Sequence, residues 1–518
     1  MSRGSLPDGW AYAQIPELIA TEGIFVDGDW VESKDQDPLG DVRLIQLADI
    51  GDGNYVSKSC RFLTSVKAQE LRCTFLKPGD VLIARMPDPL GRACIFPGDS
   101  KMAVTVVDVC VVRGNDAHFS HAWLAYFVNS PSFREAIHQL QSGSTRKRIS
   151  RGNLSTLRLP IPPRNEQTRI VAKLEELLSD LEAGVAELKA AQAKLGRYRQ
   201  SLLKAAVDGA LTADWRERHT PAETGAQLLA RILTERRARW EDKQRARFAA
   251  QGKPPPKNWQ AKYPEPVAPD TTELPALPAG WVWGSLGQCF HVAVGATPSR
   301  KEPRYWNGRI PWVSSGEVQF SRIADTRERI TEDGLRNSST QINPAGSVML
   351  GMIGEGKTRG QVSILDIDAA NNQNCAAIWV SETDIPPEYI YFWLWSRYDQ
   401  TRRGSSGNNQ PALNKSIIER IPLPLPPLSE LAEIVSLVTT GMDEIARQDG
   451  AIGKMLRQST AQRKNLLKAA FAGQLVPQDP ADEPASVLLE RIRAERDARG
   501  AVRQGRGGRR RHVAQGGA

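Results

Sequence analysis

The sequence predicts an α+β protein in which two mixed α/β domains are joined by two long, antiparallel coiled-coil helices with pseudo-twofold symmetry. Three observations predict it. Segments of the first half recur in the second half in the same order, each copy has a proline-rich boundary, and a heptad pattern follows each boundary. A chain of 518 residues has room for three or four domains.

The internal duplication is the strongest of these observations. The segment 6–10 (Leu-Pro-Asp-Gly-Trp) recurs at 277–281 as Leu-Pro-Ala-Gly-Trp. The segments 159–163 (Leu-Pro-Ile-Pro-Pro) and 202–206 (Leu-Leu-Lys-Ala-Ala) recur at 423–427 and 466–470. Because the order is kept and the spacing between the copies stays nearly constant, the chain consists of two copies of one unit.

A long helix is predicted after each proline-rich boundary. Residues before proline avoid the α region, so residues 159–163 end the preceding structure. Residues 165 to about 207 then contain no proline and carry leucines at a spacing of seven, which is typical of a coiled coil. The seam positions are Leu174, Leu181, Leu188, Leu195 and Leu202 in the first copy, and Val438, Ile445, Ile452 and Leu466 in the second.

The seams leave three arrangements open. The two helices can pair with each other, each can pack on a globular body, or the seam can form a homodimer zipper. Two matching seams in one chain favour intramolecular pairing. At 1.5 Å per residue, a helix of about 40 residues is roughly 60 Å long and would hold two domains well apart.

These boundaries divide the chain into five parts. We predict an α/β domain at 1–158, a spacer helix with a basic helix and a Pro-rich linker at 159–274, a second α/β domain at 275–422, a second spacer helix at 423–498 and a basic tail at 499–518. The linker composition is typical of an extended, semi-rigid segment. The tail is rich in arginine and glycine, and we expect it to be disordered.

Composition excludes several classes of protein. The formal net charge of +9 weakly favours a polyanionic partner. The six cysteines form no Cys-x-x-Cys pair, so we expect reduced thiols rather than a zinc ribbon. The apolar stretches are strand-sized and the segment 1–15 contains no signal-peptide core, so we expect a cytoplasmic protein without a membrane span.

Several motifs together resemble one family. They are the Leu-Pro-x-Gly-Trp starts, the Pro-x-Pro-Pro boundaries and the helix ends Leu-Leu-Lys-Ala-Ala-x-x-Gly-x-Leu at 202–211 and 466–475. The second domain adds residues 295–299 (Gly-Ala-Thr-Pro-Ser) and 371–374 (Asn-Asn-Gln-Asn), and the first adds 143–150. Over residues 5–498 the chain resembles the specificity subunits of Type I restriction–modification systems.

Two departures from the family pattern stand out. The first domain lacks the Gly-x-Thr-Pro-Ser motif and has residues 23–30 near the equivalent place. At the second boundary, Ser429-Glu430-Leu431 stands where the first has Asn165-Glu166-Gln167, as in the family.

The resemblance implies a noncatalytic subunit that binds double-stranded DNA and reads one half of a bipartite site with each domain. It also implies two modification subunits and two restriction subunits as partners. The modification subunits would methylate adenine with S-adenosylmethionine, and the restriction subunits would use ATP and Mg²⁺. This chain itself would bind no cofactor.

Candidate DNA-contacting residues follow from the chemistry of recognition, in which Arg and Lys hold phosphates and amides read base edges. In the first domain they are Arg146, Lys147, Arg148 and Arg151; a solvated loop is the alternative. In the second domain they are Thr297, Ser299, Arg300, Lys301, Arg304, Lys357, Arg359, Asn408, Asn409 and Gln410. We expect the neighbouring aromatics Tyr305, Trp306 and Trp312 to be core residues.

One motif favours an alternative function, a stand-alone P-loop NTPase or nuclease. Residues 351–358 (Gly-Met-Ile-Gly-Glu-Gly-Lys-Thr) fit the P-loop pattern letter for letter. A P-loop must open a helix, but residues 359–368 alternate like a strand, so a β-hairpin is predicted.

Other catalytic patterns are weak. Glu355-Gly356-Lys357 lacks the upstream Pro-Asp of a nuclease site, and the chain has no Asn/Asp-Pro-Pro-Tyr/Phe methyltransferase loop. His118 and His121 have no third ligand nearby in the sequence. We therefore expect no catalytic residue and no metal site.

Overall fold

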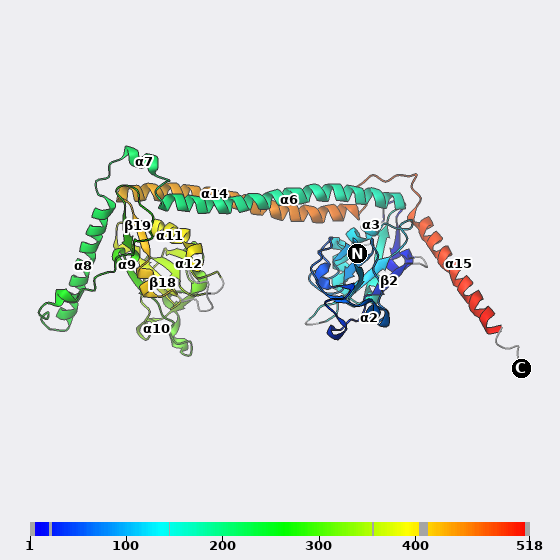
Figure 1. Ribbon diagram of the computed structural model, residues 1–518, viewed down its shortest axis with the longest axis horizontal. Helices are drawn as coiled ribbons and strands as arrows, with labels where there is room; N and C mark the ends of the chain where they lie inside the picture. Colours follow the sequence, from blue (N-terminus) through cyan, green and yellow to red (C-terminus); the bar gives the residue numbers. More distant parts are fainter. Residues whose placement is uncertain (1–5, 20–22, 144–145, 355–356, 404–412, 513–518) are drawn as a thin grey trace. The chain divides into compact units, whose positions relative to one another are not determined.

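The computed structural model describes residues 6–19, 23–143, 146–354, 357–403 and 413–512, with only the backbone of Arg403 and of 499–512 (Figure 1). The chain divides into two compact units. Unit 1 comprises residues 1–189 and 453–518, and unit 2 comprises residues 190–452. Each unit contains one α/β domain and parts of two long helices, α6 (Arg164–Val207) and α14 (Leu428–Ala470).

Unit 1 is built on three small sheets. Strand β1 (Ala11–Gln14) pairs antiparallel with β9 (Arg158–Ile161). The four-stranded sheet has the order β2 (Ile24–Asp27), β8 (Val109–Arg113), β5 (Val81–Ala84), β6 (Ala93–Ile95). The three-stranded sheet has the order β4 (Phe62–Leu63), β3 (Val42–Ile45), β7 (Met102–Thr105). The central strand β5 is fully buried, as its continuous aliphatic run requires.

Short helices cover these sheets. They are α1 (Ile15–Leu18), α2 (Ser65–Glu70), α3 (His121–Val128), α4 (Pro131–Leu140) and α5 (Arg151–Thr156), with η1 (Ser33–Asp35) and η2 (Leu47–Asp49) as 3₁₀ turns. Ser120, Ser130 and Ser150 each begin a helix, because each side chain accepts a hydrogen bond from the backbone amide three residues later. Helix α15 (Ala485–His512) also belongs to unit 1.

Unit 2 repeats this plan. Strand β10 (Val282–Ser285) pairs with β19 (Pro422–Leu425). The larger sheet has the order β11 (His291–Val294), β18 (Cys375–Trp379), β15 (Val348–Gly351), β16 (Val362–Leu365), β13 (Ser321–Ile323), and the smaller one β14 (Glu328–Ile330), β12 (Trp306–Val313), β17 (Ala370–Asn371). Its helices are α7 (Ala213–Arg218), α8 (Gly225–Ala250), α9 (Leu286–Cys289), α10 (Glu332–Arg336), α11 (Pro387–Ser396), α12 (Tyr398–Arg403) and α13 (Lys415–Glu419). The 3₁₀ turns are η3 (Trp259–Lys262), η4 (Pro303–Tyr305), η5 (Ser315–Glu317) and η6 (Val380–Glu382).

The predicted duplication is confirmed in the strand order. The order β2-β8-β5-β6 in unit 1 corresponds to β11-β18-β15-β16 in unit 2, and β4-β3-β7 corresponds to β14-β12-β17. The register agrees as well, since Ala11 pairs with Ile161 in one unit and Val282 with Leu425 in the other. In both copies the first partner directly follows the Leu-Pro-x-Gly-Trp motif, and the second is the third residue of Leu-Pro-x-Pro-Pro.

Helices α6 and α14 pack on each other in both units, as predicted. In unit 1 the buried Leu174 and Leu178 of α6 share a core with Leu467 of α14. In unit 2 Leu203 of α6 shares a core with Val438 of α14. The start of one helix therefore lies beside the end of the other, which makes the pair antiparallel. Midway seam leucines such as Leu188 are half-buried.

Two segments differ from the sequence prediction. The linker folds back onto α8, because Trp259 packs on Trp240 and Phe248, with ring centroids 5.7 and 5.8 Å apart. The tail expected to be disordered from residue 499 continues helix α15 to His512. The first turns of α15 are anchored by the buried Leu488 and Ile492, and the helix continues through residues 499–512 although four of them are glycines, which have low helix propensity.

The cysteines and the hydropathy of the helices bear on the class of protein. Cys60 is exposed, the other five cysteines are buried, and all six are free thiols. Among the described residues, we find no helix with the length and hydropathy needed to span a bilayer.

Candidate nucleic-acid interface

Each domain is anchored on a spacer helix by the same hydrogen bond. Trp10 Nε1 donates to Glu166 Oε2 at 3.0 Å, and Trp281 Nε1 donates to Glu430 Oε2 at 2.9 Å. Both carboxylates are buried. The Leu-Pro-x-Gly-Trp motif and the first turn of the long helix are thus joined, and this anchor fixes where each domain begins.

The two anchors differ in their other partners. Glu430 also accepts hydrogen bonds from Thr212 Oγ1 at 2.7 Å and from Arg216 Nη2 at 2.8 Å. The second oxygen of Glu166 has no partner among the described residues, and burial raises the pKa of Glu166. The carboxylate of unit 2 therefore has a directly bound arginine, whereas that of unit 1 has the Trp10 hydrogen bond and the more remote charge of Arg169.

The predicted basic residues of the first domain lie on a closed loop. Ser142 and Arg148 exchange backbone hydrogen bonds of 2.9 and 2.8 Å, and Ile149 after them is buried. Arg146, Lys147 and Arg148 are exposed, and none of the three forms an ion pair with another described residue. The loop therefore presents three uncompensated cations from a fixed base, as phosphate binding requires.

Arg151 lies next to this loop but is held by the domain. Its Nε lies 3.3 Å from Asp27 Oδ2, and its Nη1 donates to the carbonyl of Phe25 at 3.1 Å. The charge of Arg151 is thus partly compensated before any ligand binds. We expect a smaller contribution from Arg151 than from the loop cations.

In the second domain, the two family-like motifs lie together. Ala296 N donates to the carbonyl of Asn371 at 3.0 Å, and Thr297 Oγ1 donates to Gln373 Oε1 at 2.5 Å. A Cβ at Gly295 would lie 2.0 Å from the carbonyl oxygen of Asn371, so only glycine allows this approach. Residues 76 positions apart therefore form one surface.

Arg300 stabilises this surface through an ion pair and a contact with an aromatic ring. Its guanidinium donates to both carboxylate oxygens of Glu328 and lies over the ring of Trp306, 3.8 Å from the centroid. Lys301 is exposed and has no ion pair within the described ranges, whereas Arg304 lies 3.3 Å from Glu302. Among the predicted cations here, Lys301 is the one most available to a phosphate.

The aromatic residues beside this cluster were expected in the core. Tyr305 and Trp312 are buried, and Trp306 is half-buried. Ser299 is exposed, and its carbonyl accepts a hydrogen bond from Trp306 Nε1 at 3.2 Å. The exposed loop from Ser299 to Lys301 therefore rests on an aromatic base.

Sequence reasoning missed one residue of the first domain. Gly28 follows β2 as Gly295 follows β11, and Asp29 N donates to the carbonyl of Thr105 as Ala296 N does to that of Asn371. The next residue, Trp30, is 70% exposed. The sequence placed residues 23–30 near the equivalent position, but without the Thr-Pro-Ser letters nothing marked Trp30 itself as a contact residue.

The strands on either side of the P-loop-like segment form a hairpin, with residues 355 and 356 outside the described residues. Strands β15 and β16 are antiparallel neighbours, with Val348 opposite Ile364, and a strand rather than a helix follows the turn. Lys357 is exposed, but Arg359 is only 8% exposed and donates to the carbonyl of Arg402 at 3.4 Å. The prediction of DNA contact in this turn thus rests on Lys357. Asn408, Asn409 and Gln410 lie outside the described residues.

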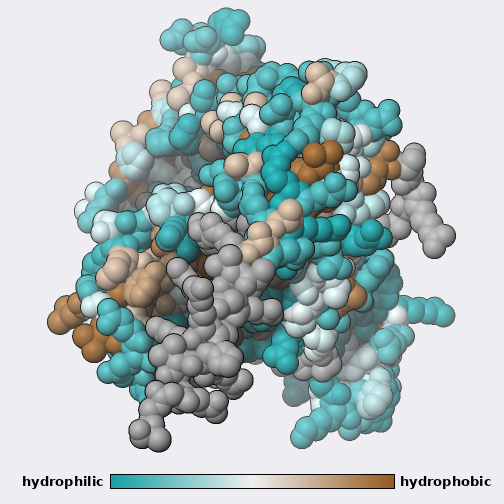
Figure 2. Space-filling view, turned by 90° about the vertical axis from the view of Figure 1, so that its right-hand side faces the viewer, coloured by the Kyte–Doolittle hydropathy of each residue, from teal (hydrophilic) through white to brown (hydrophobic). Residues whose placement is uncertain are grey.

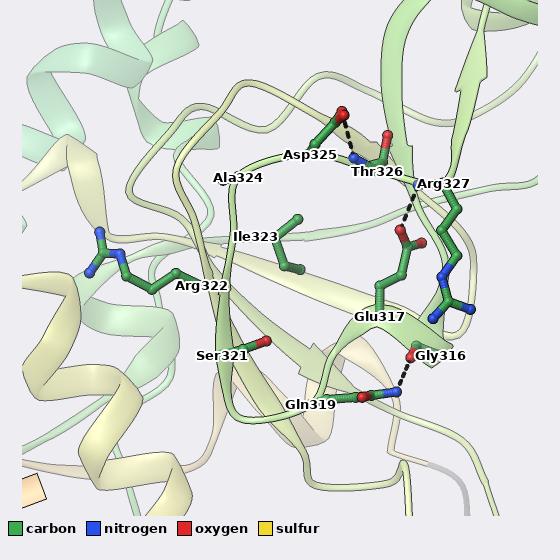
Figure 3. Close-up of a pocket in the computed structure, with 10 residues that line it drawn as sticks. All are labelled: Gly316, Glu317, Gln319, Ser321, Arg322, Ile323, Ala324, Asp325, Thr326 and Arg327. Atoms are coloured by element: carbon green, nitrogen blue, oxygen red, sulfur yellow. Dashed lines mark hydrogen bonds between the residues drawn. The ribbon is translucent and has the colours of Figure 1, made fainter. Parts of the chain in front are cut away.

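A shallow depression of about 380 Å³ between η5 and β14 adds a further cation (Figure 3). Glu317 accepts from the backbone amides of Ser314 and Arg327 at 2.8 and 2.9 Å, so its carboxylate shapes the loop. Arg322 points away from the depression toward Asp366, whereas the guanidinium of Arg327 has no ion pair in the described part of the chain. Nothing in the sequence distinguished Arg327.

The predicted histidines sit in structural surroundings. His121 Nε2 accepts from the backbone amide of Gly114 at 3.0 Å, and its Nδ1 lies 2.5 Å from Asp116. His118 is buried, 3.5 Å from Glu495. Within the described ranges we find no group of three His, Cys, Asp or Glu residues that could hold a metal ion.

Most of the face shown in Figure 2 is hydrophilic, and hydrophobic residues appear there in separate groups. A hydrophilic surface with exposed cations suits a charged, hydrated partner.

Comparison with known proteins agrees with this geometry. A family model for the Type I restriction modification DNA specificity domain matches residues 28–189 and 278–449. The specificity subunit of the Type I restriction enzyme EcoDI from Escherichia coli is 26% identical over 379 residues, covering 70% of this chain and 74% of that protein. The EcoKI specificity subunit from E. coli K12 is 23% identical over 528 residues, covering 98% and 99%.

A solved structure shares the fold. A chain from a study of complex assembly and conformational transition of the Type I R-M system superposes with a TM-score of 0.64 at 16% identity, covering 91% of this chain and all of that chain. The two family matches fall one on each copy of the repeat and together span more than half of the sequence. The chain therefore belongs to the family of Type I restriction–modification DNA specificity subunits.

Proposed function

We propose that this specificity subunit reads one half of a bipartite DNA site with each α/β domain and performs no catalysis itself. The observation that carries the proposal is the repeat of one strand order in both units, each covered by a specificity-domain match. Two copies of one reading scaffold suit two separate half-sites. The loops on the two scaffolds differ, so the half-sites would differ as well.

The reading surfaces follow from the exposed residues. In unit 1 they comprise the loop with Arg146, Lys147 and Arg148, and in unit 2 the surface around Thr297 and Lys301. Arginine and lysine hold phosphates, and the amide of Gln373 beside Thr297 is suited to base edges.

Partner subunits would supply the chemistry. Modification subunits would methylate adenine with S-adenosylmethionine, and restriction subunits would use ATP and Mg²⁺ to translocate and cut DNA. The repeat of one strand order and one family match in both units supports two modification subunits and, through them, two restriction subunits. Native mass spectrometry of the co-expressed complex measures this stoichiometry.

Methylome sequencing tests the half-site assignment. The chain is co-expressed with its modification subunit as wild type, as Gln373→Ala, as Trp30→Ala, and as the control Lys454→Ala on α14. We expect Gln373→Ala to relax the sequence at one half-site, because its amide is suited to base edges, and the exposed Trp30→Ala to relax the sequence at the other. If either variant changes both half-sites equally and the control changes neither, one domain does not read one half-site.

A further inference from the structure

A second site lies in unit 2, away from the predicted reading residues. A cleft of about 700 Å³ opens between α8, the returning segment 263–267 and the α/β domain. Its walls come from α8, from the ends of β11 and β18, and from α13. None of the residues assigned above to DNA reading lines it.

The cleft has an excess of positive charge. Arg236 and Lys243 of α8 and Arg420 after α13 line it, and none of the three has an ion pair with a described residue. Two lining acids are already engaged, Glu419 by Lys415 at 3.7 Å and Glu265 by Arg237 at 3.4 Å. Three uncompensated cations from two separate helical elements therefore face one space, together with the remaining acid Glu382.

The cleft also offers two hydrogen-bond donors, one of which has no acceptor within the described structure. The hydroxyl of Tyr263 is buried and has no partner in the described structure. Burial, and then the positive charges of Lys415, Arg236 and Lys243, lower the pKa of His291 to about 4. The imidazole is therefore neutral near pH 7 and has one N–H to donate. An unpartnered hydroxyl in a cationic cleft suits a ligand rich in acceptor oxygens.

Aromatic rings form another wall. Trp379 packs edge-on against His291, with centroids 4.7 Å apart, and its Nε1 is fixed by a 2.9 Å bond to Asn343 Oδ1. Trp240 and Tyr263, whose ring centroids are 5.4 Å apart, also line the cleft. Flat rings beside cations are what a base and its phosphate require together.

We propose that this cleft binds a nucleotide, with its phosphate on Arg236, Lys243 and Arg420 and its base against Trp379. The space is much larger than inorganic phosphate needs, so the ligand has an organic body as well as a charge. Binding involves no bond cleavage, and the site is separate from DNA reading. A free nucleotide and a nucleotide within a single strand share this chemistry.

Calorimetric titration of the purified full chain tests the proposal, with adenosine monophosphate, adenosine and inorganic phosphate as probes. We expect the nucleotide to bind more tightly than either fragment. Arg236→Ala/Lys243→Ala should weaken the affinity for the nucleotide by about tenfold or more, because each cation makes a charge-assisted contact with the phosphate. Trp379→Leu should weaken the binding of the nucleotide but leave the binding of inorganic phosphate unchanged.

A control of equal charge separates local from general effects. Arg247→Ala/Lys262→Ala removes two exposed cations that do not line the cleft. No binding of the nucleotide at millimolar concentration, or equal weakening by the control, overturns the proposal. The proposal is also overturned if poly-glutamate displaces the nucleotide and its binding depends equally on Arg236 and Lys243.

Two further arms keep the sites distinct. A short single-stranded oligonucleotide that competes with adenosine monophosphate identifies nucleic acid as the source of the nucleotide, and failure to compete identifies the free nucleotide. Duplex binding by Arg236→Ala/Lys243→Ala should equal that of wild type. A loss of duplex binding as large as the loss of nucleotide binding would make the cleft part of the DNA surface instead.

Discussion

Neutralising the basic loop of the first domain should change the salt dependence of DNA binding by a calculable amount. Arg146, Lys147 and Arg148 are exposed and have no compensating acid among the described residues, so all three charges are available to phosphates. Each phosphate contact contributes about 0.9 to the slope of log K against log salt. Arg146→Ala/Lys147→Ala/Arg148→Ala should therefore lower that slope by about 2.7.

The expected difference is large enough to measure. Between about 50 and about 200 mM salt, a slope difference of about 2.7 corresponds to roughly 40-fold in relative affinity. Fluorescence anisotropy with a labelled duplex, titrated at several salt concentrations with the modification subunit present, gives the slope directly. The change should appear on specific and nonspecific duplexes alike, because phosphates carry no sequence information.

Arg151→Ala is the matched control within the same cluster. Its ion pair with Asp27 already offsets the charge, so the slope should fall by well under about 0.9. An unchanged slope for the triple variant would refute the assignment of the loop to the DNA interface. If Arg151→Ala lowers the slope as much as the triple variant does, the ion pair with Asp27 does not offset the charge of Arg151.

The other predictions concern the framework and the P-loop-like turn. Glu430→Gln should destabilise unit 2 by about 2 kcal/mol in urea unfolding, because it removes the charge that binds Arg216. Glu166→Gln should lower the free energy of unfolding by less than about 0.5 kcal/mol. Because burial raises the pKa of Glu166, the free energy of unfolding of the wild type should fall relative to that of Glu166→Gln as the pH rises through that pKa. Four residues inserted after Leu188 and at the facing point of α14 should add roughly 6 Å, and methylome sequencing should show one to two more unread base pairs with unchanged half-sites. Lys357→Ala should leave the ATPase activity of the assembled complex intact, and loss of ATP binding by the free subunit would contradict the hairpin assignment.

The outline of the fold could be predicted because the duplication left a record in the sequence. A nearly constant offset identifies equivalent segments without any knowledge of their structure, and a heptad of leucines needs only the helical period. The pairing of β1 with β9 is implicit in the same record, since both motifs recur together. The order of the inner strands left no such record, because short strands pair across large sequence separations.

Individual site residues were harder to predict, because their availability depends on distant partners. Arg300 is held by Glu328, and Arg359 donates to Arg402, which lies 43 positions away. Neither partner can be recognised by spacing. The loop with Arg146 was identifiable because its three cations are adjacent in sequence, whereas Arg327 and Trp30 are single residues whose exposure comes from the fold.

The fold-back of the linker shows a similar limit. Proline content predicted an extended chain, and the backbone there contains little regular structure. The position of this segment is set instead by Trp259 and Tyr263, which pack on aromatic residues of α8. Two aromatic contacts outweigh a compositional preference, because each buries a large apolar surface.

The two units also show which features of the scaffold tolerate change. The Trp–Glu hydrogen bond, the strand order and the close approach of Gly28 and Gly295 to a neighbouring strand occur in both copies. The second residue after this glycine is Trp30 in one copy and Thr297 in the other. Positions that pack are thus kept while positions that face outward differ. On the proposed function, two units with identical surfaces would read the same sequence, so this divergence would give each unit a half-site of its own.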